Sequence, residues 1–168
     1  PVREYRDILR LQENGMHGRS RHLFSRNADR ITGGDNEGMA VLSEVIMNLP
    51  GYEARVKEFM AENPHSVLVP QITFRHALNL FDKQDYKAAG ALLDDVSPTQ
   101  IERSQVDEYL FKKAYCELEN GDVDRALLRF IELEKRPVSD YTSPAKYSIA
   151  YIYYEKKAFF DAMGWFEK

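Results

Sequence analysis

The residues that decide the fold are HALNLFDKQDYKAAGALL (76–93), KAYCELENGDVDRALLRF (113–130) and IAYIYYEKKAFFDAMGWF (149–166), which align without gaps. At four positions the three segments share the size of the side chain: two positions are small and two are larger. Small residues recur at Ala77, Ala114 and Ala150, and again at Ala89, Ala126 and Ala162. Larger residues recur at Tyr86, Val123 and Phe159, and again at Leu93, Phe130 and Phe166. Every series has spacings of 37 and then 36 residues, so the chain contains an internal repeat.

The repeat has the pattern of two helices joined by a turn. Apolar residues recur three and four apart, and the alternation expected of strands is nearly absent. Alanine at a helix crossing allows close approach, and the turns are marked by Gln84-Asp85 and Gly121-Asp122. Because one such pair cannot bury its apolar face alone, successive pairs must stack. The sequence predicts an all-α fold of about ten helices, with antiparallel pairs stacked into a right-handed α-solenoid and no sheet.

The first half of the chain carries the same repeat more weakly. LRLQENGMHGRSRHLF (9–24) aligns with CELENGDVDRALLRF (116–130), with Ser20 as the small residue and Phe24 as the large one. A second unit is split by Pro50-Gly51 and has Arg55 where alanine is expected, beside Ala54. We therefore expect a single solenoid fragment over 1–168. Its five predicted units cover about 1–30, 36–63, 70–96, 104–136 and 143–168.

Composition excludes several classes of protein. The 168 residues are 43% hydrophobic and 30% charged, which is typical of a globular chain. The net charge of −4 disfavours non-specific nucleic-acid binding, and no apolar run approaches the roughly 20 residues of a membrane span. The basic segment HGRSRHLFSRNADR (17–30) is predicted to be a solvated helix face. It could also contact phosphate, but it lacks the interleaved aromatic residues of a nucleic-acid platform.

No set of residues predicts catalysis, a cofactor or a metal. The histidines at 17, 22, 65 and 76 are too dispersed for a zinc site. TGGDNEG (32–38) lacks the lysine and hydroxyl residue of a phosphate loop and is predicted to be a linker. Cys116 is interpreted as a packed thiol. Nothing in the sequence combines a nucleophile, a base and an oxyanion site, so we predict that these residues are not an enzyme.

The pattern resembles the tetratricopeptide repeat (TPR), strongly over 73–168 and moderately over 1–64. FMAENPHSVLVPQITFRHALNLFDKQDYKAAGALLDDV (59–96) is similar to units of the long envelope-associated TPR proteins of Bacteroidetes. The resemblance implies a non-catalytic scaffold that binds a protein or peptide. It also implies export to the periplasm or outer membrane.

The resemblance assigns one face of the first helices to a concave, peptide-binding groove. Candidate groove residues are Phe74, Leu78, Phe81, Phe111, Lys112, Tyr115, Tyr147, Tyr151 and Tyr154. TPR proteins that clamp a carboxylate use paired lysine and asparagine on these helices. The matching positions hold Phe74 with Leu78 and Phe111 with Tyr115, so that clamp is absent.

A second interpretation places this aromatic stripe inside each unit, with its polar neighbours forming the groove. It is favoured by three charged residues at formal core positions, since charged side chains are seldom buried. These residues are Lys113, Glu117 and Lys146. The tyrosines could also serve both roles, with a buried ring and a solvated hydroxyl.

Aromatic residues also crowd the end of the chain. Phe159, Phe160, Trp165 and Phe166 lie in a helix pattern that no further unit follows in the sequence. We therefore expect self-association or fraying through the C-terminal end, because an uncovered apolar surface tends to recruit a partner. An alternative function is a recruiting or regulatory segment of a larger protein whose catalytic domain lies elsewhere.

Overall fold

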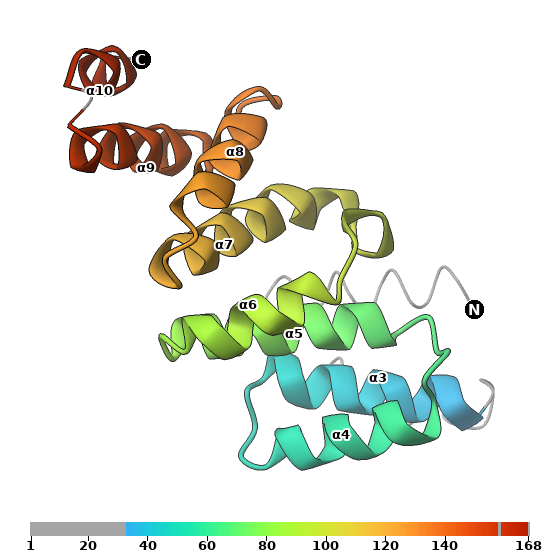
Figure 1. Ribbon diagram of the computed structural model, residues 1–168. Coiled ribbons are helices and arrows are strands. Elements are labelled where there is room, and N and C mark those ends of the chain that lie inside the picture. The colour runs from blue at the N-terminus through green and yellow to red at the C-terminus, as the bar shows by residue number, and fades with distance from the viewer. Residues whose placement is uncertain (1–32, 158, 168) are drawn as a thin grey trace. The chain divides into compact units, whose positions relative to one another are not determined.

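The computed structural model describes residues 33–157 and 159–167 (Figure 1). Within these ranges it contains eight α-helices, two 3-10 helices and no strand, as the helical periodicity predicts. The predicted first unit (1–30), with its basic segment, lies outside the described residues. Two compact units form, 1–76 (unit 1) and 77–168 (unit 2), and helix α5 (Val69–Asp82) runs from one into the other.

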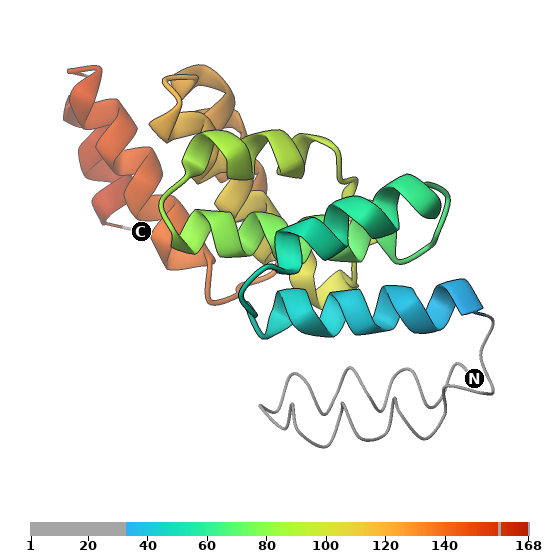
Figure 2. The same ribbon diagram turned by 90° about the horizontal axis from the view of Figure 1, so that it is seen from below.

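Unit 1 contains the pair α3 (Gly33–Ile46) and α4 (Tyr52–Glu62), which pack against each other (Figures 1 and 2). Their facing apolar residues recur three and four apart, so each helix buries one side. The buried residues are Met39, Val41, Leu42, Val45, Tyr52, Val56 and Phe59, together with Leu68 and Ile72. The core of unit 1 therefore joins this pair to the start of α5.

Two predictions for unit 1 are wrong. The prediction of a linker over 32–38 is wrong for 33–38, because α3 begins at Gly33. Gly38 is buried, and a Cβ atom there would lie 2.7 Å from both Phe59 Cζ and Leu68 Cδ1. Glycine therefore lets these side chains approach the helix closely. In α4, neither Ala54 nor Arg55 takes the small buried position, since both are exposed and Val56 is buried instead.

Unit 2 contains α6 (Tyr86–Asp94), α7 (Val106–Glu119), α8 (Val123–Glu134), α9 (Thr142–Glu155) and α10 (Phe159–Phe166). Each helix packs against the next one in the chain. Two 3-10 helices, Pro98–Gln100 and Arg103–Gln105, connect α6 to α7. The repeated residues that are fully buried are Ala77, Ala89, Leu93, Ala114, Ala126, Phe130 and Ala150. These aligned positions are therefore buried alike, whereas Phe166, which aligns with Leu93 and Phe130, is 54% exposed.

The turns repeat with the same period. The second residue after each first helix has a positive φ, at Asn48 (47°), Gln84 (63°), Gly121 (87°) and Lys157 (59°). In the first three turns, the next N–H donates to the carbonyl five residues earlier, at 3.0, 2.9 and 2.8 Å. This pattern satisfies carbonyls at the helix end. In the turns after Gln84 and Gly121, an aspartate then caps the following helix by accepting from a backbone N–H.

Unit 1 departs from this pattern because its turn is two residues longer. Helix α4 starts four residues after Asn48, whereas α6 and α8 start two residues after Gln84 and Gly121. Gly51, with φ of 82°, precedes α4 as a second left-handed residue. The longer turn does not explain the exposure of Arg55, because Arg55 is the fourth residue of its helix, as Ala89 and Ala126 are of theirs. In α4 this position is exposed, and Val56 is buried instead.

Candidate functional site

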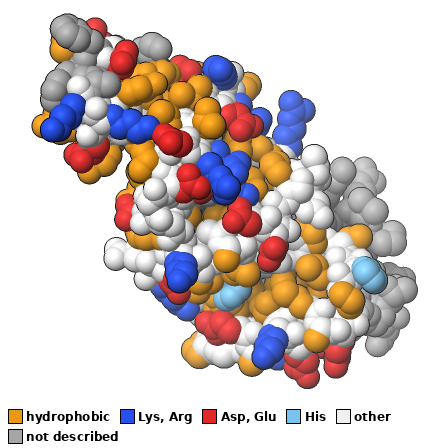
Figure 3. All heavy atoms as spheres, viewed as in Figure 1, with side chains coloured by type: hydrophobic (Ala, Val, Ile, Leu, Met, Phe, Trp, Pro, Cys, Tyr) orange, Lys and Arg blue, Asp and Glu red, His pale blue; other side chains and the backbone are white. Residues whose placement is uncertain are grey.

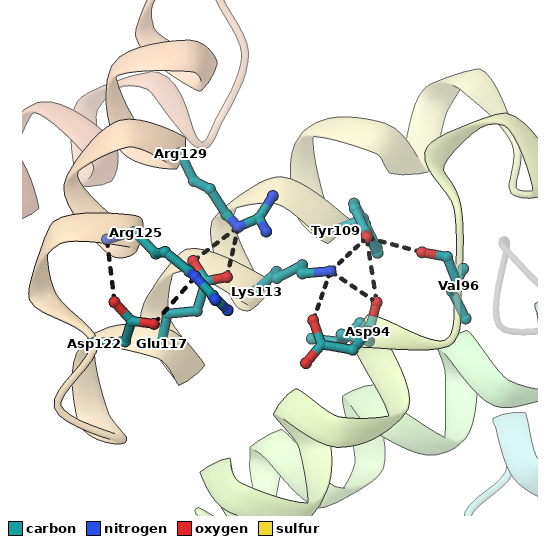
Figure 4. A network of polar contacts seen from close by, with 9 residues as sticks. Asp94, Val96, Tyr109, Lys113, Glu117, Asp122, Arg125 and Arg129 are labelled. Atoms are coloured by element: carbon teal, nitrogen blue, oxygen red, sulfur yellow. Dashed lines mark hydrogen bonds and ion pairs between the residues drawn. The ribbon is translucent and has the colours of Figure 1, made fainter.

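A polar network joins α6, α7 and α8 in unit 2 (Figure 4). Lys113 on α7 is only 7% exposed. Its ammonium contacts Asp94 Oδ1 at 2.9 Å and donates to the Leu93 carbonyl and the Tyr109 hydroxyl, both at 3.2 Å. The Tyr109 hydroxyl also lies 2.8 Å from the Val96 carbonyl, to which it donates. The expectation that Lys113 is not buried is therefore wrong, because partners at the end of α6 satisfy its charge.

The other two charged core positions are also partly covered. Glu117 accepts from Arg129 Nε at 2.7 Å through both carboxylate oxygens, and its side chain is 12% exposed. Lys146 is half-buried. On α7, Tyr109, Lys113 and Glu117 lie four residues apart and so share one helix face. That face is used for polar contacts inside unit 2.

The candidate groove residues occupy three different environments. Phe74 and Leu78 on α5 are buried. Phe81, Phe111, Lys112 and Tyr115 are half-buried. On α9, Tyr147, Tyr151 and Tyr154 are 64%, 46% and 54% exposed. The stripe is thus interior at its start and open to solvent at its end, so neither interpretation from the sequence describes all of it.

The difference between Phe111 and Tyr147 has a structural cause. Phe111 packs on Phe130, with ring centroids 5.7 Å apart, and Tyr147 packs on Phe166 at 5.9 Å in the same way, one repeat later. Phe111 is also covered by Tyr141, the residue before α9, at 5.5 Å. No helix pair follows α10 in the described residues to supply the equivalent cover for Tyr147.

The half-buried rings form a continuous cluster in unit 2. Phe81, Tyr86 and Tyr115 lie mutually edge to face, with centroids 5.2 to 5.4 Å apart. Tyr115 is followed by Phe111, at 6.2 Å. Edge-to-face geometry is the favoured arrangement of aromatic pairs. We call Phe81, Tyr86, Phe111, Tyr115 and Tyr141 the ring cluster.

Sequence reasoning missed two members of the ring cluster. Tyr86 aligns with the turn-packing positions of the repeat, and Tyr141 precedes a helix and has no place in the alignment. Desolvation and the nearby Glu108 carboxylate, which accepts a hydrogen bond from Tyr141, raise the pKa of Tyr141 to about 12. Burial, and then Glu119, raise the pKa of Tyr115. Both hydroxyls therefore stay protonated at neutral pH.

Lys112 lies at the edge of the ring cluster. Its ammonium is 3.9 Å from the centroid of the Phe81 ring and 3.5 Å from Asp82 Oδ1. A cation over an aromatic face is attracted by the electron-rich ring. The charge of Lys112 is thus held by both a ring and a carboxylate.

The remaining candidates for a site in the described part of the chain are a metal centre, the histidines and the cysteine. Those residues contain no group of three or more His, Cys, Asp or Glu side chains arranged to hold a metal ion. His76 Nδ1 lies 2.8 Å from the Tyr52 hydroxyl. Cys116 is fully buried, and burial raises its pKa to about 12, as a packed thiol requires. Among the helices of residues 33–157 and 159–167, none is long and apolar enough to cross a membrane.

Comparison with known proteins shows the fold. No family model and no curated protein matches the sequence. A solved structure titled MamA AMB-1 is similar, with a TM-score of 0.67 and 18% sequence identity, over 99% of this chain and 87% of that chain. MamA is a TPR-like protein, so the predicted all-α, TPR-like solenoid class is confirmed. The narrower resemblance to envelope proteins of Bacteroidetes stays a prediction.

Proposed function

We propose that the chain is a non-catalytic scaffold that binds a protein or peptide through the first-helix face of unit 2. The observation that carries this proposal is the row Tyr147, Tyr151 and Tyr154 on α9. These residues are spaced by four and three, so they share one side of the helix, and about half or more of each side chain is exposed. Tyrosine supplies a large contact area and a polar hydroxyl, which is why it is enriched in interfaces.

The surroundings of this row support a binding surface. Phe166 and Met163 on the adjacent α10 are also more than half exposed. On the face shown in Figure 3, hydrophobic side chains gather around the α9 end of unit 2, with charged groups at their edges. An apolar centre with a polar rim is the usual composition of a protein interface. We call Tyr147, Tyr151, Tyr154, Met163 and Phe166 the α9 surface.

Selection from a random peptide display library tests this proposal and requires no assumption about the identity of the partner. For the peptides selected on the wild-type protein, the dissociation constant is measured by fluorescence anisotropy. It is measured both for the wild-type protein and for the double variant Tyr147→Ser, Tyr151→Ser. We expect the dissociation constant to rise at least about tenfold, because an aromatic anchor commonly contributes more than about 1 kcal/mol.

Leu128→Ser is the matched control, since Leu128 is 69% exposed on α8 and lies outside the α9 surface. This variant is expected to bind the peptides as the wild-type protein does. The proposal fails if the library yields no binder, or if the selected peptides bind the double variant and the wild-type protein equally well.

The location implied by the resemblance is a separate proposal. We propose that the protein is exported to the bacterial envelope, which rests on the similarity of 59–96 to envelope TPR units. Cell fractionation of the source bacterium with an antibody against this chain tests it. Recovery in the cytoplasmic fraction would contradict it.

A further inference from the structure

We propose that the ring cluster of unit 2 binds a basic segment of the partner, with a lysine or arginine side chain placed over its aromatic faces between surrounding carboxylates. This inference rests on the proposed scaffold function and specifies the chemistry of its partner. It concerns α5, the start of α6, α7 and the residue before α9, and not the tyrosine row of the α9 surface.

The distribution of charge favours a basic partner. Residues 77–168 contain 17 Asp and Glu against 13 Lys and Arg, whereas 1–76 contain ten of each. The whole net charge of −4 therefore falls in unit 2. A negative surface raises the association rate of a positively charged segment and disfavours an acidic one.

Carboxylates surround the ring cluster. Besides desolvation, the carboxylates of Glu108, Asp140 and Asp82 raise the pKa of Tyr141, and Glu108 also accepts a hydrogen bond from its hydroxyl. Glu119 accepts a hydrogen bond from Tyr115 on the same side of α7. Asp82 and Asp140 are exposed, so their carboxylates can reach an arriving cation.

Lys112 shows how the ring cluster and a neighbouring carboxylate bind a cation. Its ammonium lies over Phe81 and beside Asp82, and its side chain is only 17% exposed. A lysine is rarely covered to that extent unless its charge is satisfied. The same ring and carboxylate would hold a partner's ammonium or guanidinium once Lys112 moves aside. Lys112 thus acts as an internal competitor for the partner's basic side chain.

Three substitutions test the site with a labelled hexalysine peptide as the probe and fluorescence anisotropy as the measurement. Lys112→Met removes the competitor and is expected to lower the dissociation constant by about two- to fivefold. Phe81→Leu removes the ring without changing charge and is expected to raise it by about the same factor. Asp82→Asn, at a side chain 72% exposed, is also expected to weaken binding without affecting the fold.

Lys135→Met and Asp95→Asn are the matched controls, because both residues are exposed, lie in unit 2 and make the same charge changes outside the ring cluster. The proposal is overturned if Lys112→Met tightens binding no more than Lys135→Met, or if Phe81→Leu and Asp82→Asn leave it unchanged. It is also overturned if a hexaglutamate peptide binds as tightly as hexalysine.

Failure here is distinguishable from failure of the scaffold function. Library peptides that depend on Tyr147 and Tyr151, found together with hexalysine binding that the ring-cluster substitutions leave unchanged, would leave the scaffold in place and remove the cation site. An absence of any library binder would remove the scaffold itself.

Discussion

Left-handed residues at the turns are the strictest local requirement in this chain. Of the four that come two residues after a first helix, only Gly121 is a glycine; Asn48, Gln84 and Lys157 carry a Cβ at positive φ. Asparagine tolerates this conformation, whereas glutamine and lysine adopt it at a cost. The strain is offset by the helix-ending hydrogen bonds that each turn makes. Glycine would lack the strain and still permit the same bonds.

Gly121→Ala and Gln84→Gly are therefore expected to shift stability in opposite directions. Apart from Gly121 and its two chain neighbours, no atom of the described residues lies within 4 Å of a Cβ built at Gly121, so the alanine variant suffers only backbone strain, costing about 1 kcal/mol. Gln84→Gly relieves strain and is expected to stabilise by about 0.5–1 kcal/mol. Urea unfolding of both variants measures these changes. A destabilised Gln84→Gly would show that the glutamine side chain contributes more than its backbone costs.

Gly38 shows what a sequence pattern does not reveal at the residue scale. Its neighbours TGGDNEG resemble a flexible connection, yet Gly38 lies in α3 against Phe59 and Leu68. Those contacts come from residues 21 and 30 positions away. Local composition carries no information on such contacts, so the linker prediction was wrong.

At the scale of the elements, the helix pairs were predictable because the repeat supplies several independent markers. Alanines, large residues and turn residues all shift together by 36 or 37 positions, and the observed helices follow them. The same period could not reveal Lys113, because its burial depends on Asp94 and the Leu93 carbonyl on the preceding helix. In the sequence alone, a charged residue at a core position suggests that the helix register is wrong. The structure shows instead that the charge has partners on the preceding helix.

Ala114→Trp tests the packing of the α7 and α8 pair. Ala114 is fully buried, so a tryptophan there must force neighbouring side chains apart, at a cost of about 1–3 kcal/mol. We expect the melting temperature to fall by several degrees. Leu128→Trp, at an exposed position on α8, is the control and should leave the melting temperature nearly unchanged. Equal melting curves for the Ala114 variant and the wild-type protein would mean that α7 and α8 do not cross closely at this residue.

For the molecule as a whole, the candidate site was predictable only in part. The sequence identified the first helices as the carriers of aromatic residues at fixed spacing. It could not tell which rings are covered, because that depends on the neighbouring pair: Tyr141 covers Phe111, and no later residue in the described chain covers Tyr147 in this way. Tyr141 lies outside the repeat alignment and could be found only in the folded structure.

The α9 surface leads to a prediction about association. We expect the protein to self-associate at high concentration through this surface, since exposed apolar groups gain free energy by burial. Met163→Glu with Phe166→Glu should shift the molecular mass in light scattering toward the monomer, whereas Leu128→Glu should not. A designed polar helix pair added after α10 should have the same effect as the double substitution.

Hydrogen exchange provides the second measurement of this prediction. Amides of α10 are expected to exchange faster than those of 104–135, because α10 has a helix neighbour on one side only in the described chain. A monomeric wild-type protein whose α10 is as protected as 104–135 would contradict the prediction.

The nearly equal spacing of the left-handed turn residues has a consequence for how such a chain changes its length. Gln84 and Gly121 have the same backbone conformation, and each is followed by an aspartate that caps the next helix. Removing residues 85–121 would join Gln84 to Asp122 and recreate a turn of the same stereochemistry and cap. Duplicating the same residues would do likewise. A gene encoding this array can therefore lengthen or shorten by whole repeats through recombination, without having to invent a new turn at the junction.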